Sequence, residues 1–275
     1  MKARNLFWSV RRETWENRSL YIAPIAIAGL ALFGFVLHLG RGVANAGVLP
    51  VPFGMAASMV LVTGWVVGLF YALDALHGER RDRSILFWKS MPVSDAEAVI
   101  AKLAVALVVI PAIAMAVALA MQLLMLVASS AIFAAKGAGA TAPLAGVPLP
   151  KMSLVMIYGV VAHSFWFAPI YAWLLLVSGW ARRAPFLWAF LPVFALFALE
   201  AIAFGSRHVL DFLKYRLVGA MGHAFAPGAL ERPITEISQL TPGTLLGTPG
   251  FWLGLVFAAL CIAAAIRLRR YRDPI

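Results

Sequence analysis

The chain has 275 residues, of which 63% are hydrophobic and only 13% are charged. Soluble domains average about half apolar and about a quarter charged residues, so this composition excludes an ordinary soluble domain and indicates a membrane protein. The formal net charge of +11 is then typical of basic loops on the cytoplasmic side rather than of a nucleic-acid-binding surface. A single cysteine, Cys261, allows neither an intramolecular disulfide nor a cysteine metal site.

Apolar runs along the chain predict the membrane spans. A helix needs about 20 mainly apolar residues to cross roughly 30 Å of hydrocarbon. Six runs are long enough, and the third is longer than one crossing requires, so we expect it to tilt or project. The predicted fold class is therefore all-α, a single polytopic transmembrane domain over 1–275. Its spans are 20–39, 54–76, 96–133, 153–180, 185–205 and 250–266.

The distribution of lysine and arginine predicts the orientation of these spans, because short cytoplasmic loops carry the excess of basic residues. With both termini inside, sixteen basic residues lie on the cytoplasmic side and seven outside. We therefore expect both termini in the cytoplasm and a multi-pass protein of the cell (inner) membrane. The seven outer residues are Arg41, Lys136, Lys151, Arg207, Lys214, Arg216 and Arg232.

Two predicted segments lie beside the membrane. Residues 1–19 place Leu6, Phe7, Val10 and Trp15 among charged residues at helical spacing, which predicts an interfacial helix on the inner leaflet. A frayed basic tail is the alternative.

On the outer side, 206–249 is the longest connection. It carries a second helical pattern that predicts a re-entrant or surface-lying helix, with a lid-like loop as the alternative. That pattern is made by Val209, Leu210, Leu213, Leu217 and Met221.

The sequence contains none of the motifs that would indicate catalysis. A G-x-x-x-x-G-K-[ST] phosphate loop is absent, as are H-E-x-x-H and G-x-S-x-G. His208 and Asp211 stand one helical turn apart, which is weak support for a metal site. We therefore assign no catalytic residue and no metal site to this chain.

Ionisable residues inside spans are candidates for function, because each costs about 2.5–3.5 kcal/mol at a helix centre unless it meets water or a partner. His163 and Glu200 are such residues, and a structural hydrogen bond between helices is an equally good explanation for both. Asp74, near the end of the second span, is expected to pair with nearby arginines. Trp166 and Tyr171 complete the candidate pathway, although interfacial belts also explain aromatic residues at span ends.

The connection between the second and third spans concentrates charge in an otherwise apolar chain. Ser94 and Glu97 form an S-x-x-E capping box that predicts the start of the third span. Glu79 and Arg83 are spaced for an i,i+4 ion pair on a helix. Between these features, residues 85–88 are four consecutive large apolar side chains, which outside a bilayer should be covered by lipid, by the chain or by another protein.

At these residues the sequence resembles the permease subunit of an ABC-2 type transporter. In that family an amphipathic helix precedes six spans. The cytoplasmic link between spans two and three carries a charged run, a small residue, an apolar cluster and a Pro-Val-Ser. Here those parts are 79–84, 85–88 and 91–94, followed by Lys102 in the third span.

The resemblance implies a function and a set of partners. The chain would form the export pathway for an amphipathic or hydrophobic substrate, such as a lipid or a peptide antibiotic. It would pair with a second permease subunit, identical or related, and bind no nucleic acid. The link, 77–95, would dock on a separate ATP-binding subunit that holds the ATP and the magnesium, so this chain would not itself be an enzyme. The expected docking residues are Glu79, Arg80, Arg81, Arg83, Ile85, Leu86, Phe87 and Trp88.

Two other classes remain open. A membrane enzyme acting on lipid would use His163 and Glu200 as acid and base, but proton transfer needs groups within hydrogen-bond reach, and no convergent polar cluster is visible. An ion-coupled secondary transporter should show matching halves with broken spans. Pro111, Pro169 and Pro192 interrupt spans, but the chain shows no convincing internal repeat.

Overall fold

The computed structural model describes residues 2–42, 46–90, 93–227 and 237–271. The described residues are 87% helical and form no strand apart from one isolated bridge between Phe225 and Leu240. Among these residues, six helical segments are long and apolar enough to cross a membrane, which confirms the predicted number. They are Ser19–Gly40, Ala46–Arg81, Asp95–Ala135, Leu149–Trp180, Pro185–Phe204 and Pro249–Tyr271.

The spans consist of helices α2 (Ser19–Gly40), α3 (Pro50–Asp74), α6 (Asp95–Ala104), α7 (Ile110–Ala135), α9 (Leu149–Trp180), α10 (Pro185–Phe204) and α13 (Pro249–Tyr271). The shorter elements are α1 (Lys2–Glu16), η1 (Ala46–Val48), α4 (His77–Arg81), α5 (Ser84–Ser90), α8 (Ala142–Gly146), α11 (His208–Ala224), η3 (Ile237–Gln239) and α12 (Pro242–Gly247).

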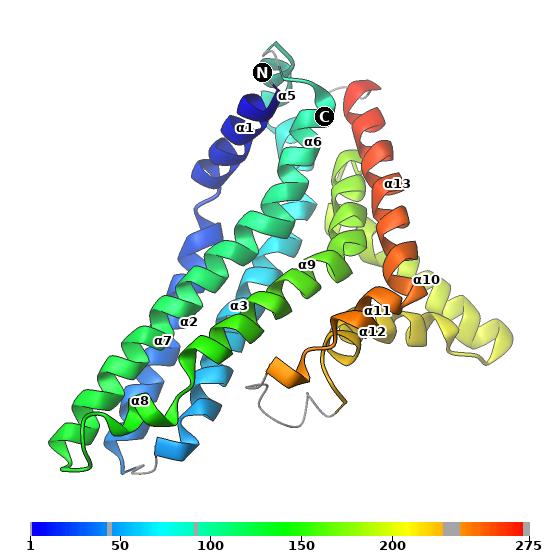
Figure 1. Ribbon diagram of the computed structural model, residues 1–275. Helices are drawn as coiled ribbons and strands as arrows, with labels where there is room; N and C mark the ends of the chain where they lie inside the picture. The colour runs from blue at the N-terminus through cyan, green and yellow to red at the C-terminus, as the bar shows by residue number, and fades with distance from the viewer. Residues whose placement is uncertain (1, 43–45, 91–92, 228–236, 272–275) are drawn as a thin grey trace.

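The spans pack into two groups that share α9. Helices α2, α3 and α7 pack side by side, and α9 joins α3 to α13 (Figure 1). Phe35 and Phe53 fill the core of the first group, while Tyr71, Leu175 and Ala265 belong to a second core near the other end of the bundle. Buried apolar surface thus holds α9 between the two groups.

The ends of the bundle separate the segments that we predicted on opposite sides of the membrane. Helix α1, the α4–α5 connection, the start of α6 and the end of α13 gather at one end, while η1 and α8 lie at the other (Figure 1). Six spans require this arrangement, because an even number of crossings brings both ends of the chain to the same side. Which side faces the cytoplasm stays a prediction.

The third span contains an irregular turn. Residues Val105–Val109 form a π-helical turn between α6 and α7, in which the Ile110 N–H donates to the Val105 carbonyl. Pro111 follows at once; it has no N–H to donate and its ring clashes with the carbonyl four residues earlier. A wider turn relieves that clash, so the span continues through the proline.

Helix α10 stands apart from the bundle, with Ala189 as its one buried side chain (Figure 1). It leads to α11, which confirms a helix where the apolar spacing predicts one. That this connection lies on the outer side stays a prediction. The side chains that α11 buries are Arg216, Ala220 and Ala224. Its Leu217, part of the predicted apolar pattern, is 56% exposed.

The connection between spans two and three contains two short helices. Ser94 and Glu97 form the predicted capping box: the Glu97 N–H donates to Ser94 Oγ at 3.2 Å, and the Ser94 N–H donates to Glu97 Oε2 at 2.9 Å. The expected ion pair between Glu79 and Arg83 is wrong. Helix α4 ends at Arg81, and Arg83 has a left-handed φ of +58°, so helical i,i+4 spacing does not reach it.

Candidate functional site

A cluster of charged residues, buried except for the partly exposed Asp95, lies where α1, α4, α6 and α13 meet. We define this charge cluster as Glu13, Glu79, Asp95, Lys102 and Arg269. Lys102 Nζ lies 2.7 Å from Glu13 Oε1 and 3.1 Å from Glu79 Oε1. Arg269 pairs with Glu79 through Nη1, and its Nε lies 3.2 Å from Asp95 Oδ1. Four helices are therefore held together by ion pairs at one end of the bundle.

Burial makes these pairs strongly interdependent. Lys102 is 2% exposed, Glu13 is 3% exposed and Arg269 is 6% exposed. A buried charge pair need not stabilise a protein more than apolar residues would, but removing one partner costs about 3–5 kcal/mol because the other charge is left uncompensated. The cluster thus fixes the relative positions of its helices more than it adds net stability.

Glu13 links the charge cluster to α3. Besides Lys102, it accepts a hydrogen bond from Tyr71 Oη on α3 at 2.8 Å, and Arg12 Nη2 lies 2.7 Å from Oε1. Burial alone would raise the pKa of Glu13. The charges and hydrogen bonds of Lys102 and Arg12 outweigh it and hold the pKa below its usual value. Glu13 is therefore a carboxylate that ties α1 to α3 and α6.

Helix α4 is fixed to the end of α9 as well as to the charge cluster. Ser178 Oγ accepts the backbone N–H groups of Leu76 at 3.0 Å and His77 at 2.9 Å. Arg80 Nη1 donates to the Gly179 carbonyl at 2.8 Å. These bonds occupy buried polar groups of both segments, so α4 and the end of α9 should move together.

Helix α5 contains the four apolar residues that we predicted as one cluster, but their side chains do not form a single surface. Ile85 is buried, and Trp88 lies beneath the guanidinium of Arg12, which is 3.7 Å from the ring centroid. Leu86 and Phe87 are each 59% exposed. The outward surface of α5 is therefore this pair, which we call the exposed apolar pair.

The charged residues of the predicted docking surface likewise divide into buried and exposed ones. Glu79 and Arg80 are buried inside the chain, where they hold the charge cluster and the α9 terminus. Arg81 and Arg83 are exposed and lie a few residues before the exposed apolar pair in the chain. Arg81 also pairs with Asp74 at 3.8 Å, as predicted for that acid. A partner at this surface would meet Arg81, Arg83, Leu86 and Phe87, whereas Glu79, Arg80 and Ile85 would act from inside.

Three of the predicted pathway residues lie on α9. His163 is buried between the rings of Trp65, at 3.6 Å between centroids, and Phe167, at 3.9 Å. Tyr171 Oη donates to the Trp65 carbonyl at 3.3 Å. His163 and Tyr171 therefore both join α9 to α3 through the same tryptophan.

Trp166 contacts a different helix. Its Nε1 donates to the Arg216 carbonyl at 2.9 Å, and the Arg216 guanidinium lies 5.0 Å from its ring centroid. Arg216 is 8% exposed, and burial lowers its pKa. Trp166 thus joins α11 to α9. Arg216 is part of that contact, although the sequence identifies it only as an outer basic residue.

Glu200 lies away from these residues, at the end of α10. Its carboxylate accepts Ser206 Oγ at 2.5 Å and the backbone N–H groups of His208 at 2.6 Å and Val209 at 2.7 Å. These N–H groups belong to the first turn of α11, whose donors have no partner within the helix. Glu200 therefore caps α11, and the structure does not bring it together with His163.

Comparisons with known proteins do not add a relative. No protein-family model, no curated protein and no solved structure matches the chain. The charge cluster and the exposed apolar pair are therefore the features on which a function can be based.

Proposed function

We propose that the chain is the membrane-spanning permease subunit of an ABC-2 type transporter, with α4 and α5 as the element that couples it to a separate ATP-binding subunit. The observation that carries the proposal is a contrast within one short connection. Its inner residues are bonded to the bundle, whereas Leu86 and Phe87 are exposed on its outer side. A connection that served only to join two spans would need neither feature.

The contacts of α4 explain how a displacement of α5 would be transmitted to the spans. Glu79 joins α4 to Lys102 in the third span and to Arg269 in the sixth. Ser178 joins the same segment to α9. Because these bonds are short and buried, displacing α4 would move three spans, which is what coupling to ATP binding and hydrolysis requires.

Helix α1 belongs to the same unit. Arg12 lies over Trp88 of α5 and 3.5 Å from Glu79 of α4, while Glu13 pairs with Lys102. Phe7 and Trp15 are 60% and 67% exposed, which suits an interfacial helix that rests on the inner leaflet. We propose that a second permease copy completes the pathway and that the substrate is an amphipathic or hydrophobic molecule, such as a lipid or a peptide antibiotic, which would be exported.

A lipid-modifying enzyme is less well supported. His163 is enclosed by Trp65 and Phe167, and the carboxylate of Glu200 is occupied by Ser206 and the α11 backbone. Acid–base catalysis needs two groups that reach the same substrate. The contacts of His163 and Glu200 instead join different pairs of helices.

The test is capture of the ATP-binding partner from the native membrane. The tagged chain would be purified in mild detergent, and co-purifying proteins would be searched for the G-x-x-x-x-G-K-[ST] motif. We expect such a protein with the wild type and at least a tenfold loss with Leu86→Asp plus Phe87→Asp. The control is Leu246→Asp on α12, where the side chain is similarly exposed at 51%.

Two outcomes would contradict the coupling assignment: a wild-type preparation without a phosphate-loop protein, or full retention of that protein by the double variant. The genes beside this one give an independent check, because an adjacent ATP-binding cassette gene is expected and a biosynthetic or resistance cluster would indicate the substrate.

A further inference from the structure

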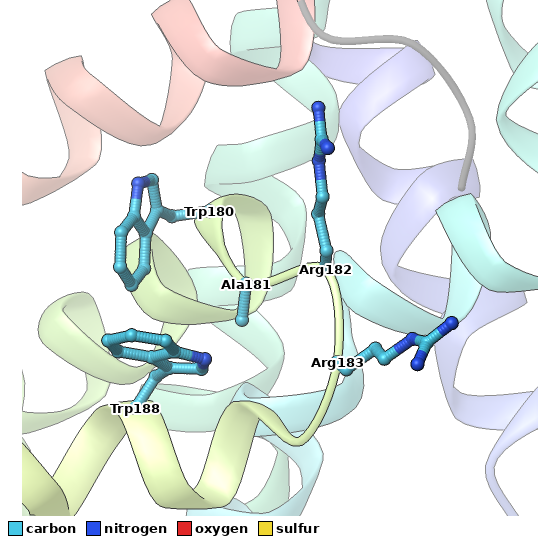
Figure 2. A pocket seen from close by; sticks show the side chains of 5 residues that line it. All are labelled: Trp180, Ala181, Arg182, Arg183 and Trp188. Carbon is cyan, nitrogen blue, oxygen red and sulfur yellow. The ribbon is translucent and has the colours of Figure 1, made fainter.

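The turn between α9 and α10 borders an open pocket of about 400 Å³. None of the proposed pathway or docking residues lines it. It is lined by Trp180, Ala181, Arg182, Arg183 and Trp188. Figure 2 shows the two indole rings on one side of the Ala181 methyl group and the two arginine side chains on the other. The pocket therefore has an aromatic wall and a cationic rim.

The rim carries positive charge that is not matched nearby. Arg182 and Arg183 are exposed, and neither forms an ion pair among the described residues. No acidic residue lines the pocket. Because both side chains are exposed, their guanidinium groups can turn toward an anion placed between them, and arginine binds phosphate oxygens through two parallel N–H donors.

The end of α9 would ordinarily oppose an anion here, because the last carbonyls of a helix carry partial negative charge. Arg80 removes much of that effect. Its Nη1 donates to the carbonyls of Gly179 at 2.8 Å and Ala181 at 3.4 Å, and Ala181 lines the pocket. A third, buried arginine thus offsets the helix end and makes the floor of the pocket more favourable to negative charge.

The position of the pocket relative to the spans indicates the kind of anion. Helix α9 ends at Trp180 and α10 begins at Pro185. Both are candidate spans, so we expect the turn that joins them to lie at the level of the lipid head groups. Trp180 and Trp188 pack edge to face, with centroids 4.9 Å apart. Tryptophan is enriched at this level because its ring suits the boundary between acyl chains and head groups.

We propose that this pocket binds the head group of an anionic phospholipid, with its phosphate held by Arg182 and Arg183 and its glycerol and upper acyl chain lying against Trp180 and Trp188. The inference needs the membrane spans but not the transport function. The two arginines sit on a four-residue turn that Ala184 closes with a left-handed φ of +49°, so a lipid bound there contacts both spans.

Native mass spectrometry of the detergent-purified protein tests the proposal. Phosphatidylglycerol and phosphatidylcholine with identical acyl chains would be titrated separately, and the Kd of the first bound lipid compared. We expect tighter binding of phosphatidylglycerol by the wild type. Arg182→Gln plus Arg183→Gln should weaken that binding roughly 25-fold, at about fivefold for each arginine near a lipid surface.

The matched control is Arg207→Gln plus Lys214→Gln, which removes two exposed positive charges at α11. Its affinity for phosphatidylglycerol should stay within about twofold of the wild type, whereas added salt should weaken wild-type binding. Size-exclusion chromatography would confirm that both double variants keep the wild-type fold.

A third arm distinguishes a lipid from a soluble anion. Inorganic phosphate in large excess should leave phosphatidylglycerol bound, because it cannot use the aromatic wall. Displacement by phosphate would overturn the lipid assignment in favour of a soluble anion site. Equal affinity for the two lipids, or unchanged binding by the Arg182 and Arg183 variant, would overturn the proposal outright.

Discussion

Lys102 Nζ lies 2.7 Å from Glu13 Oε1 although the two residues are 89 positions apart in the chain. Neither residue is more than 3% exposed. This one contact joins the helix before the first span to the start of the third, and Tyr71 extends it into the second span. The amphipathic start of the chain is therefore bonded into the bundle by its charged residues.

Replacing Lys102 with Met should lower the free energy of unfolding by about 3–5 kcal/mol, because Glu13 and Glu79 would lose their shared cation while staying buried. Thermal unfolding in detergent measures the change. Lys214→Met, at an exposed lysine of α11, is the control and should change stability little. Adding Glu13→Gln to Lys102→Met should restore part of the loss; a double variant no better than the single one would speak against direct pairing.

Acid should weaken the protein through Glu13. Its pKa is lowered from the usual value of about 4.5, so below that pH the unfolded chain binds a proton more readily than the folded one. The contribution of Glu13 is fully present at neutral pH and is lost as the pH falls through the folded-state pKa. We expect Glu13→Gln to flatten this part of the plot of unfolding free energy against pH. A Gln variant with the wild-type slope would assign the acid sensitivity to other carboxylates.

Ser178→Ala should loosen α4 from α9. The substitution leaves the buried N–H groups of Leu76 and His77 without an acceptor, which costs about 1–3 kcal/mol for each buried group. Hydrogen exchange read by mass spectrometry should show faster exchange in the peptide that contains these two residues. Ser58→Ala is the control, since the exposed Ser58 hydroxyl bonds only to the Met55 carbonyl of its own helix. Equal exchange in both variants would remove the role assigned to Ser178.

Glu200→Ala should fray the start of α11. The carboxylate accepts two backbone N–H groups there, and losing a helix cap costs about 0.5–2 kcal/mol. Hydrogen exchange should increase at His208 and Val209 while the rest of the bundle is unchanged. Asp211→Ala, within the same helix, should not reproduce the effect. Unaltered exchange in Glu200→Ala would instead make Glu200 available for a role in the pathway.

Residue patterns predicted the parts of this fold that depend on local chemistry. Apolar runs predicted the six candidate spans. A long apolar segment that crosses a bilayer has to satisfy its own backbone hydrogen bonds, and a helix does this without distant contacts. The Ser94–Glu97 box is likewise a local arrangement of two residues three positions apart, and it forms as expected. Such features need no knowledge of distant contacts.

The long-range contacts could not be predicted in this way. Glu13, Lys102 and Arg269 lie in three separate segments, and no spacing rule relates them. A partial signal exists: Lys102 and Arg269 are cations set among apolar helical residues, and such charges are usually paired. The partner becomes evident only when the helices are placed.

The apolar cluster of α5 shows a second limit. Residues 85–88 looked like one surface because they are consecutive, but each residue of a helix turns about 100° from the last. Ile85 therefore points into the chain, Leu86 and Phe87 point outward, and Trp88 returns toward Arg12. The same geometry selects Leu86 and Phe87, and not Trp88, as the positions at which to test docking.

The π-helical turn at Val105–Val109 changes which neighbours the third span can reach. A π turn holds one more residue than a regular turn, so the side chains after it are rotated by about 100° relative to those before it. Lys102 can therefore face α1 and α4, while Ala114 and Ala118, farther along the same span, face the opposite group of helices. The turn is geometrically equivalent to one extra residue, which changes the rotational phase of one half of the helix relative to the other. Deleting a single residue there should therefore misalign either the ion pairs of Lys102 or the packing of α7 against α2 and α3, but leave the span intact.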